Sequence, residues 1–87
     1  MNKEALEELG TFFKKIRARH DITQKDVADV CEYETTQFVS NVERGLAMPS
    51  PVLIKAYADL SGEAKIALVR RVVRVLEKDL LERVAEA

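Results

Sequence analysis

The feature that most restricts the fold is the segment of residues 22–45, which reads as two short helices joined by a turn. Thr23 is a residue type favoured at helix N-caps, and Asp26 stands three residues later, where a capping box needs an acceptor side chain. These signals predict a first helix at about residues 24–31. A second helix should follow directly after the turn.

That second helix is predicted at about residues 36–44. Thr35 can accept a hydrogen bond from an amide of the following turn, and Gly45 is a natural C-terminal stop. Helical spacing puts Val39 and Val42 on one face, which can pack, and the opposite face carries Thr36, Gln37, Ser40, Asn41 and Arg44. Asparagine and glutamine can pair bidentately with a base edge, and threonine can contact a thymine methyl group or a phosphate. The alternative is an ordinary solvated polar face.

Several motifs are spread over about residues 9–60: Leu9-Gly10 through Arg17, Thr23-Gln24, Val27-Ala28, Gln37 through Gly45, and Pro49-Ser50-Pro51. Together they resemble the Cro/phage-repressor (Xre-like) helix-turn-helix family. The resemblance implies a lambda-repressor-like domain in which Ala28 lies at the helix crossing and Glu-Arg-Gly closes the recognition helix. It also implies that this helix enters the major groove of double-stranded DNA.

The resemblance further pairs Arg17 with Glu43. A carboxylate beside the packing face of its helix would be costly without a partner, which favours a structural role for Glu43 over a base contact. The turn departs from the family pattern, because glycine is common where this chain has Glu32. Glu32 and Glu34 would then repel a DNA backbone, unless Glu34 accepts from a cytosine amino group or both are surface acids without a role.

Two classes of DNA contact are expected from the helix-turn-helix segment. Gln37 and Asn41, with Thr36, are the candidates for reading bases, and Ser40 is a further DNA-contact candidate on the same face. Helix N-termini and flanking cations usually hold the DNA backbone, so the candidates for phosphate contacts are Gln24, Thr35 and Arg44.

The remaining sequence predicts three more helices. Apolar residues follow helical spacing from Lys3 to about Arg19, although Gly10 weakens the middle and could mark a break. Ser50 followed by Pro51 is a strong helix start, and that helix should run to about residue 60. Between the recognition helix and this start, the apolar residues Leu46 and Met48 are expected to fold back on the core.

The last helix is predicted over about residues 63–85, with no proline or glycine to interrupt it. Its apolar residues cover more than one packing face, so part of them must lie outside the monomer core. A membrane-surface helix would look similar, but the acidic residues Glu77, Asp79, Glu82 and Glu86 argue against it. We therefore expect residues 1–61 to form the DNA-binding domain and residues 62–87 to form a dimerisation element.

Composition limits the other possibilities. The 87 residues contain one cysteine and one histidine, so neither an internal disulfide nor a metal site nor a catalytic constellation can be assembled, and no cofactor is expected. The net charge of -1 predicts modest non-specific DNA affinity.

With no signal peptide or spanning segment in view, a cytoplasmic protein is expected. The sequence thus predicts an all-α, five-helix transcriptional regulator that is not an enzyme. The rival interpretation is a protein-binding adaptor or antitoxin component on the same fold.

Overall fold

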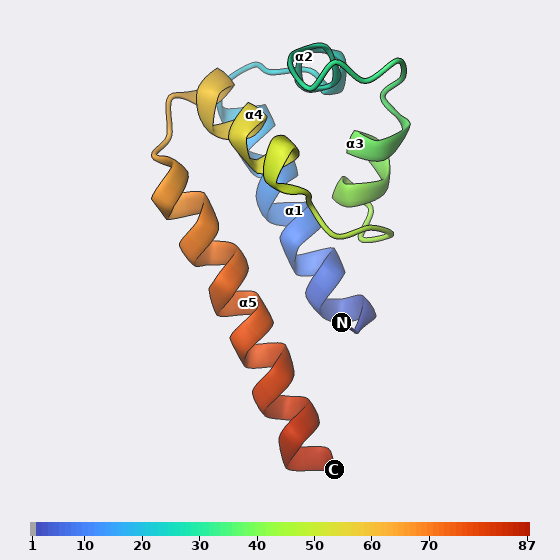
Figure 1. Cartoon of the computed structure of the whole chain (residues 1–87), viewed down its shortest axis with the longest axis vertical. Coiled ribbons are helices and arrows are strands. Elements are labelled where there is room, and N and C mark those ends of the chain that lie inside the picture. The colour runs from blue at the N-terminus through green and yellow to red at the C-terminus, as the bar shows by residue number, and fades with distance from the viewer. Residues whose placement is uncertain (1) are drawn as a thin grey trace.

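The computed structural model describes residues 2–87, which form five helices and no strand. The helices are α1 (Lys3–Arg19), α2 (Gln24–Val30), α3 (Gln37–Glu43), α4 (Pro51–Ser61) and α5 (Lys65–Glu86). Figure 1 shows α1 between α3 on one side and α5 on the other, with α2 and α4 at the end where α1 finishes. The predicted all-α, five-helix architecture with a long C-terminal helix is therefore confirmed.

Helix α1 is a single continuous helix, so the break considered at Gly10 does not exist. Gly10 is buried where α1 crosses the C-terminal end of α3. A Cβ atom at this position would lie 2.5 Å from the backbone oxygens of both Val42 and Glu43. The glycine is thus required by the close approach of two backbones, and helix continuity is kept in spite of its low helix propensity.

The capping box at the start of α2 forms as predicted. The Thr23 hydroxyl accepts from the Asp26 amide at 3.0 Å, and the Asp26 carboxylate accepts from the Thr23 amide at 2.9 Å. At the other end of α2, the amide of Tyr33 donates to the carbonyl of Ala28 at 2.9 Å, which is the long bond of a Schellman motif. This motif needs a left-handed residue, and Glu32 supplies it with φ of 61°. The family preference for glycine at this position therefore has a conformational cause.

Helix α3 begins one residue later than predicted. Its N-cap is Thr36, whose side chain makes no capping hydrogen bond, while the Thr35 hydroxyl accepts from the amide of Gln37 at 3.3 Å. The helix ends in a second Schellman motif, in which Gly45 has φ of 77° and the amide of Leu46 donates to the carbonyl of Asn41 at 2.8 Å. Gly45 is thus the stop that the sequence indicated.

The core is shared by all five helices. Its largest fully buried side chains are Leu9, Phe13, Ile16, Val27, Val39, Val42, Leu53, Tyr57 and Leu68. The expectation that Leu46 and Met48 fold back on this core is wrong, because both are exposed. The chain reverses at the end of α3, so that Ala47 packs against the core and Pro49 is buried in their place.

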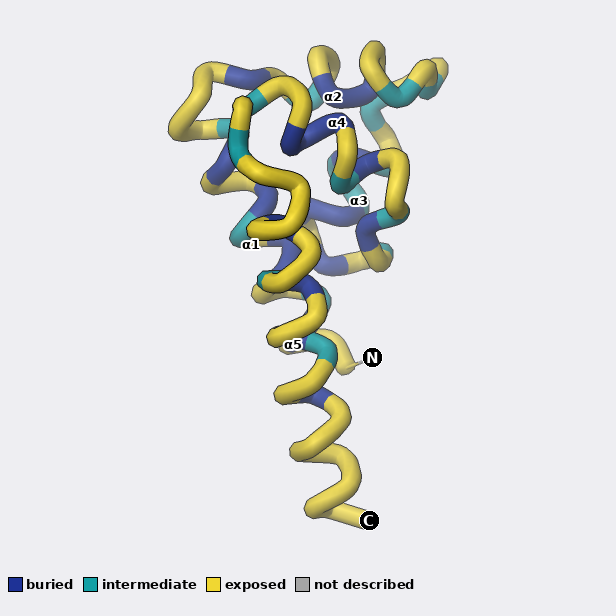
Figure 2. The backbone as a smooth tube through the Cα atoms, turned by 60° about the vertical axis from the view of Figure 1, so that its left-hand side comes forward, coloured by how far each residue is buried: buried dark blue, intermediate teal, exposed yellow. Residues whose placement is uncertain are grey.

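Helix α5 buries only one of its faces. Leu68, Val72 and Val75 are buried, and Asp79 continues the same face with a 3.6 Å ion pair to Arg83. Beyond this face the C-terminal half of α5 is exposed and runs past the rest of the molecule (Figure 2). The prediction that part of its apolar surface lies outside the monomer core is confirmed.

Candidate nucleic-acid interface

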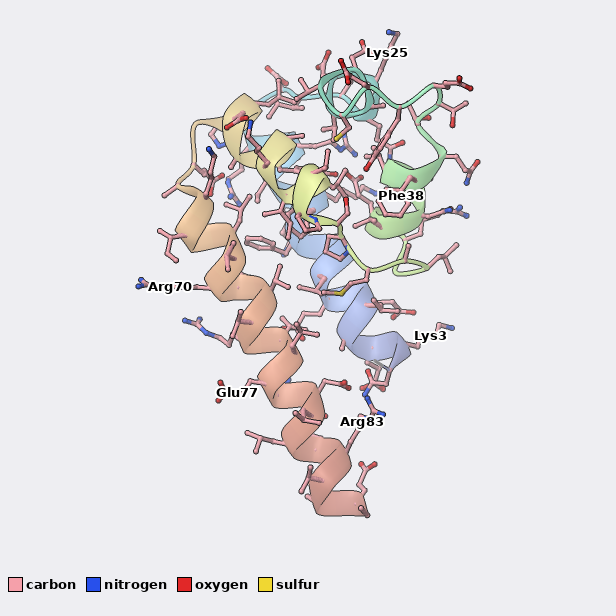
Figure 3. The ribbon with its side chains drawn as sticks, in the orientation of Figure 1. Lys3, Lys25, Phe38, Arg70, Glu77 and Arg83 are labelled. Atoms are coloured by element: carbon pink, nitrogen blue, oxygen red, sulfur yellow. The ribbon has the colours of Figure 1, made fainter. Side chains whose placement is uncertain are left out.

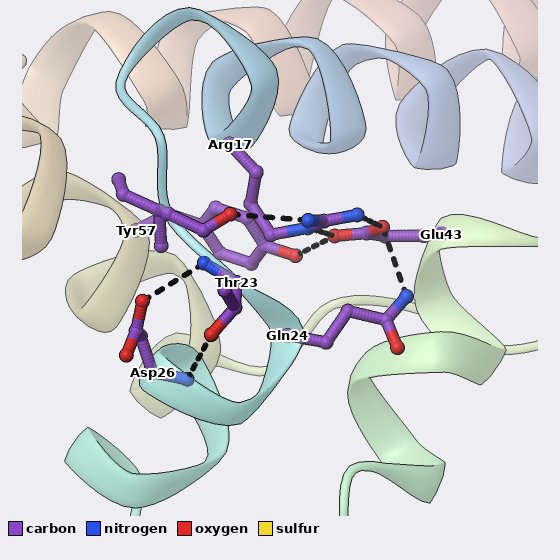
Figure 4. A network of polar contacts seen from close by, with 7 residues as sticks. Arg17, Thr23, Gln24, Asp26, Glu43 and Tyr57 are labelled. Carbon is purple, nitrogen blue, oxygen red and sulfur yellow. Dashed lines mark hydrogen bonds and ion pairs between the residues drawn. The ribbon is translucent and has the colours of Figure 1, made fainter.

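A buried polar cluster at the C-terminal end of α3 is centred on the Glu43 carboxylate (Figure 4). Glu43 accepts a bidentate pair of hydrogen bonds from Arg17, with Nε at 2.6 Å from Oε2 and Nη2 at 2.7 Å from Oε1. It also accepts from Gln24 Nε2 at 3.2 Å and from the hydroxyl of Tyr57. The predicted pair of Arg17 and Glu43 therefore forms. The side chain of Glu43 is 2% exposed and is buried, whereas that of Arg17 is 17% exposed and is only partly buried.

The pKa values in this cluster agree with a charged pair. Burial by itself would raise the pKa of the Glu43 carboxyl, but the hydrogen bonds from Arg17, Tyr57 and Gln24 outweigh it and hold the pKa below its ordinary value. Burial and the neighbouring carboxylate raise the pKa of Tyr57 far above its usual range. Tyr57 therefore stays a neutral donor, and Glu43 stays ionised.

The cluster joins four helices. Arg17 comes from α1, Gln24 from α2, Glu43 from α3 and Tyr57 from α4, and Arg17 also donates to the carbonyl of Ile22 at 3.1 Å. A seven-residue helix such as α3 has little stability of its own. Its orientation relative to α2 must therefore come from this cluster and from the packing of its apolar face.

The opposite face of α3 is polar and internally hydrogen-bonded. Asn41 Oδ1 accepts from Gln37 Nε2 at 2.9 Å and from Arg44 Nη2 at 2.8 Å. Gln37 and Arg44 are exposed, and Asn41 is half-buried. Three of the predicted site residues thus meet in one polar array on the surface of the helix.

The other predicted site residues surround this array at the helix starts. Thr35, Thr36 and Ser40 lie in or next to the first turn of α3, with Thr36 and Ser40 half-buried. Gln24 is the first residue of α2, and its amide nitrogen is directed inward to Glu43. The structure therefore places the seven candidates on α2, on α3 or in the residues that flank α3, with Gln24 engaged in the buried cluster.

Tyr57 is the contributor to this site that the sequence alone did not reveal. In the sequence Tyr57 stands four residues after Leu53, which is the spacing of one helix face, and its burial agrees with a packing position. The available signal was chemical, since a buried tyrosine hydroxyl needs a partner and a buried carboxylate needs donors.

The charges around α3 are mixed. Arg44 is exposed at its C-terminal end, whereas Glu32 and Glu34 are exposed in the turn before it. On α2, Lys25 is paired with Asp29 at 2.9 Å. This edge of the molecule therefore has no strong positive excess, in line with the net charge of -1.

Helices α2 and α3 are short and are joined by a turn. A buried ion-pair cluster holds α3 against α2, and α3 presents a polar face. This arrangement defines a helix-turn-helix DNA-binding domain. Comparison with protein families agrees: residues 13–63 match the helix-turn-helix family of the Cro/C1 type. The match covers more than half of the chain, and the protein belongs to this family. This is a DNA-binding family and not an enzyme family, which fits the expectation that the chain is not an enzyme.

A search among curated proteins gave no match to the chain. In the part of the chain that the structure describes, no helix combines the length and the apolar character needed to cross a membrane.

Proposed function

We propose that this protein is a sequence-specific transcriptional regulator that binds double-stranded DNA as a homodimer, with α3 in the major groove, and that it acts in the cytoplasm. The observation that carries the proposal is the polar array on α3. One face of α3 carries Gln37, Asn41 and Arg44. The opposite face of α3 is held by burial, and its C-terminal end is held by the Glu43 cluster. Rigidly presented amide groups suit the reading of base edges, and a guanidinium group beside them suits a phosphate of the DNA backbone.

Within this proposal the side chains divide by role. Gln37 and Asn41, assisted by Thr36 and Ser40, contact bases. Arg44 at the end of α3 and Thr35 at its start contact phosphates. Gln24 contributes through its backbone amide at the N-terminus of α2, because its side-chain amide donates to Glu43.

Selection from a random pool of DNA duplexes, followed by a salt titration, tests the proposal. The wild type should enrich one motif, and a dimer should enrich a motif with two-fold symmetry. Gln37→Ala should lower affinity for that motif by about 1 to 3 kcal/mol and relax its selectivity. Arg44→Ala should weaken binding to every duplex and reduce the salt slope by about 1, and Lys78→Ala on the distant part of α5 is the matched control.

A second candidate is a protein-binding adaptor or antitoxin component built on the same fold. The observation that favours it is the acidic turn before α3, where Glu32 and Glu34 are exposed beside the proposed DNA-contacting face. Uniform, weak binding to the duplex pool without an enriched motif would support this candidate and refute the regulator.

A further inference from the structure

Helix α5 carries two apolar seams, of which the monomer uses one. The buried seam packs against α1 and α4. The second seam consists of Ile66, Val69, Val73, Leu76 and Leu80, in which Leu76 is half-buried and the others are between 42% and 60% exposed. The spacings of three, four, three and four residues are those of core positions in a coiled coil. The geometry therefore offers a second helix a place along α5.

The second seam continues into a groove beside α4. This groove, of about 270 Å³, is lined by Pro51, Ile54 and Val69, with the side chains of Lys55 and Lys65 also lining it. Val69 belongs to both the groove and the seam. An apolar side chain from a helix lying on the seam would reach this groove, next to two cations.

The charges of α5 are divided between its two halves. Residues 65–76 contain four cations and no acid, whereas residues 77–86 contain four acids and two cations. Two such helices side by side repel if they are parallel, because like halves meet, and attract if they are antiparallel.

We propose, building on the homodimer of the proposed function, that the partner on this seam is the α5 helix of a second copy and that the two helices run antiparallel. In this arrangement Val69 packs opposite Leu80 of the partner subunit, and Val73 packs opposite Leu76 of the partner subunit. Leu80 of the partner subunit then lies beside the groove at α4.

The residues that flank the seam fix the orientation. In an antiparallel pair, Arg70 lies beside Glu77 of the partner subunit, and Lys65 lies near Glu86 of the partner subunit. In a parallel pair, Lys65 would instead lie beside Arg70 of the partner subunit. Figure 3 shows Arg70 and Glu77 extending from the side of α5 that faces away from α1, where both are free to meet another helix.

The available area suits a specific but modest dimer. The exposed side chains of the seam, with Leu81 and Val84 nearby, offer on the order of 500 Å² per copy, which puts the pair near the lower limit for specific protein interfaces.

Charge reversal followed by sedimentation equilibrium of the whole chain tests the orientation. Arg70→Glu and Glu77→Arg should each raise the dimer dissociation constant about tenfold, since each converts two symmetric attractions into repulsions, and the double variant should restore it. Lys78→Glu is the matched control, because it changes charge equally on the opposite side of the helix. A tighter dimer for Arg70→Glu, or no recovery in the double variant, would overturn the antiparallel arrangement.

Disulfide trapping gives a direct reading in a Cys31→Ser background. A mixture of Arg70→Cys and Glu77→Cys chains should cross-link to each other, and a mixture of Lys65→Cys and Arg70→Cys chains should not. Cross-linking between the Lys65→Cys and Arg70→Cys chains would show a parallel pair and refute the proposal. A wild-type monomer at tens of micromolar would refute the dimer itself, while duplex selection would still report on DNA binding by a single copy.

Discussion

The Glu43 cluster makes a quantitative prediction about stability. The carboxylate accepts two hydrogen bonds from Arg17 and one each from Gln24 and Tyr57, and it is almost completely buried. Arg17→Met removes half of these bonds and the only cation of the cluster, and leaves the charge of Glu43 uncompensated. Removal of one member of a buried ion pair lowers the free energy of unfolding by about 3 to 5 kcal/mol. For a domain of this size that is a large part of the total.

The double variant Arg17→Met/Glu43→Leu should be more stable than the sum of the single variants predicts, because an apolar pair of similar volume leaves no unpaired charge. Urea unfolding followed by circular dichroism measures all four proteins. Lys14→Met, an exposed cation on the same helix, is the control and should change stability by less than about 0.5 kcal/mol. Additive effects below about 1 kcal/mol for the two single variants would mean that the pair does not stabilise the fold.

Three further predictions concern pH and backbone geometry. The pKa of Glu43 is lower in the folded protein than in the unfolded chain, so the contribution of Glu43 to stability is complete above the ordinary carboxyl pKa and is lost as the pH falls through the folded pKa. Glu43→Gln should therefore reduce the dependence of the urea midpoint on acid pH. Equal pH dependence of the midpoint in the wild type and in Glu43→Gln would contradict this. Glu32→Gly should raise the free energy of unfolding by about 1 kcal/mol, since φ is 61° there, whereas Glu34→Gln should not; calorimetric melts of both variants would show the difference. Gly10→Ala should lower the melting temperature despite its better helix propensity, at a loss of about 1 to 3 kcal/mol, because a Cβ meets backbone oxygens at 2.5 Å; an unchanged melt would refute the close crossing.

Most of the fold was predictable because its signals are local. Apolar periodicity, the capping box at Thr23 and the Ser50-Pro51 start each depend on residues within one or two turns, and the helices lie within two residues of the predicted ranges. The resemblance to the helix-turn-helix family supplied the pairing of Arg17 with Glu43, which no local pattern contains.

What could not be predicted depends on contacts between distant elements. Gly10 looks like a weak point within its own helix, and only the crossing of α3 shows why glycine is needed. Leu46 and Met48 have core-like side chains, but the chain reversal at Gly45 leaves them exposed. Tyr57 reads as an apolar packing residue until the position of Glu43 is known.

The hydrogen bonds among Gln37, Asn41 and Arg44 bear on how strictly this protein would choose its site. Many recognition side chains are left without partners when they face a wrong base, and that loss enforces fidelity. Here the Asn41 carbonyl oxygen already receives hydrogen bonds from both neighbours in the absence of DNA. A mismatched base would let these groups return to one another, so each mismatch should cost close to the lower limit of the usual range of about 1 to 3 kcal/mol. If α3 reads bases as proposed, the protein would therefore tolerate sequence drift in its sites and could serve a family of related operators.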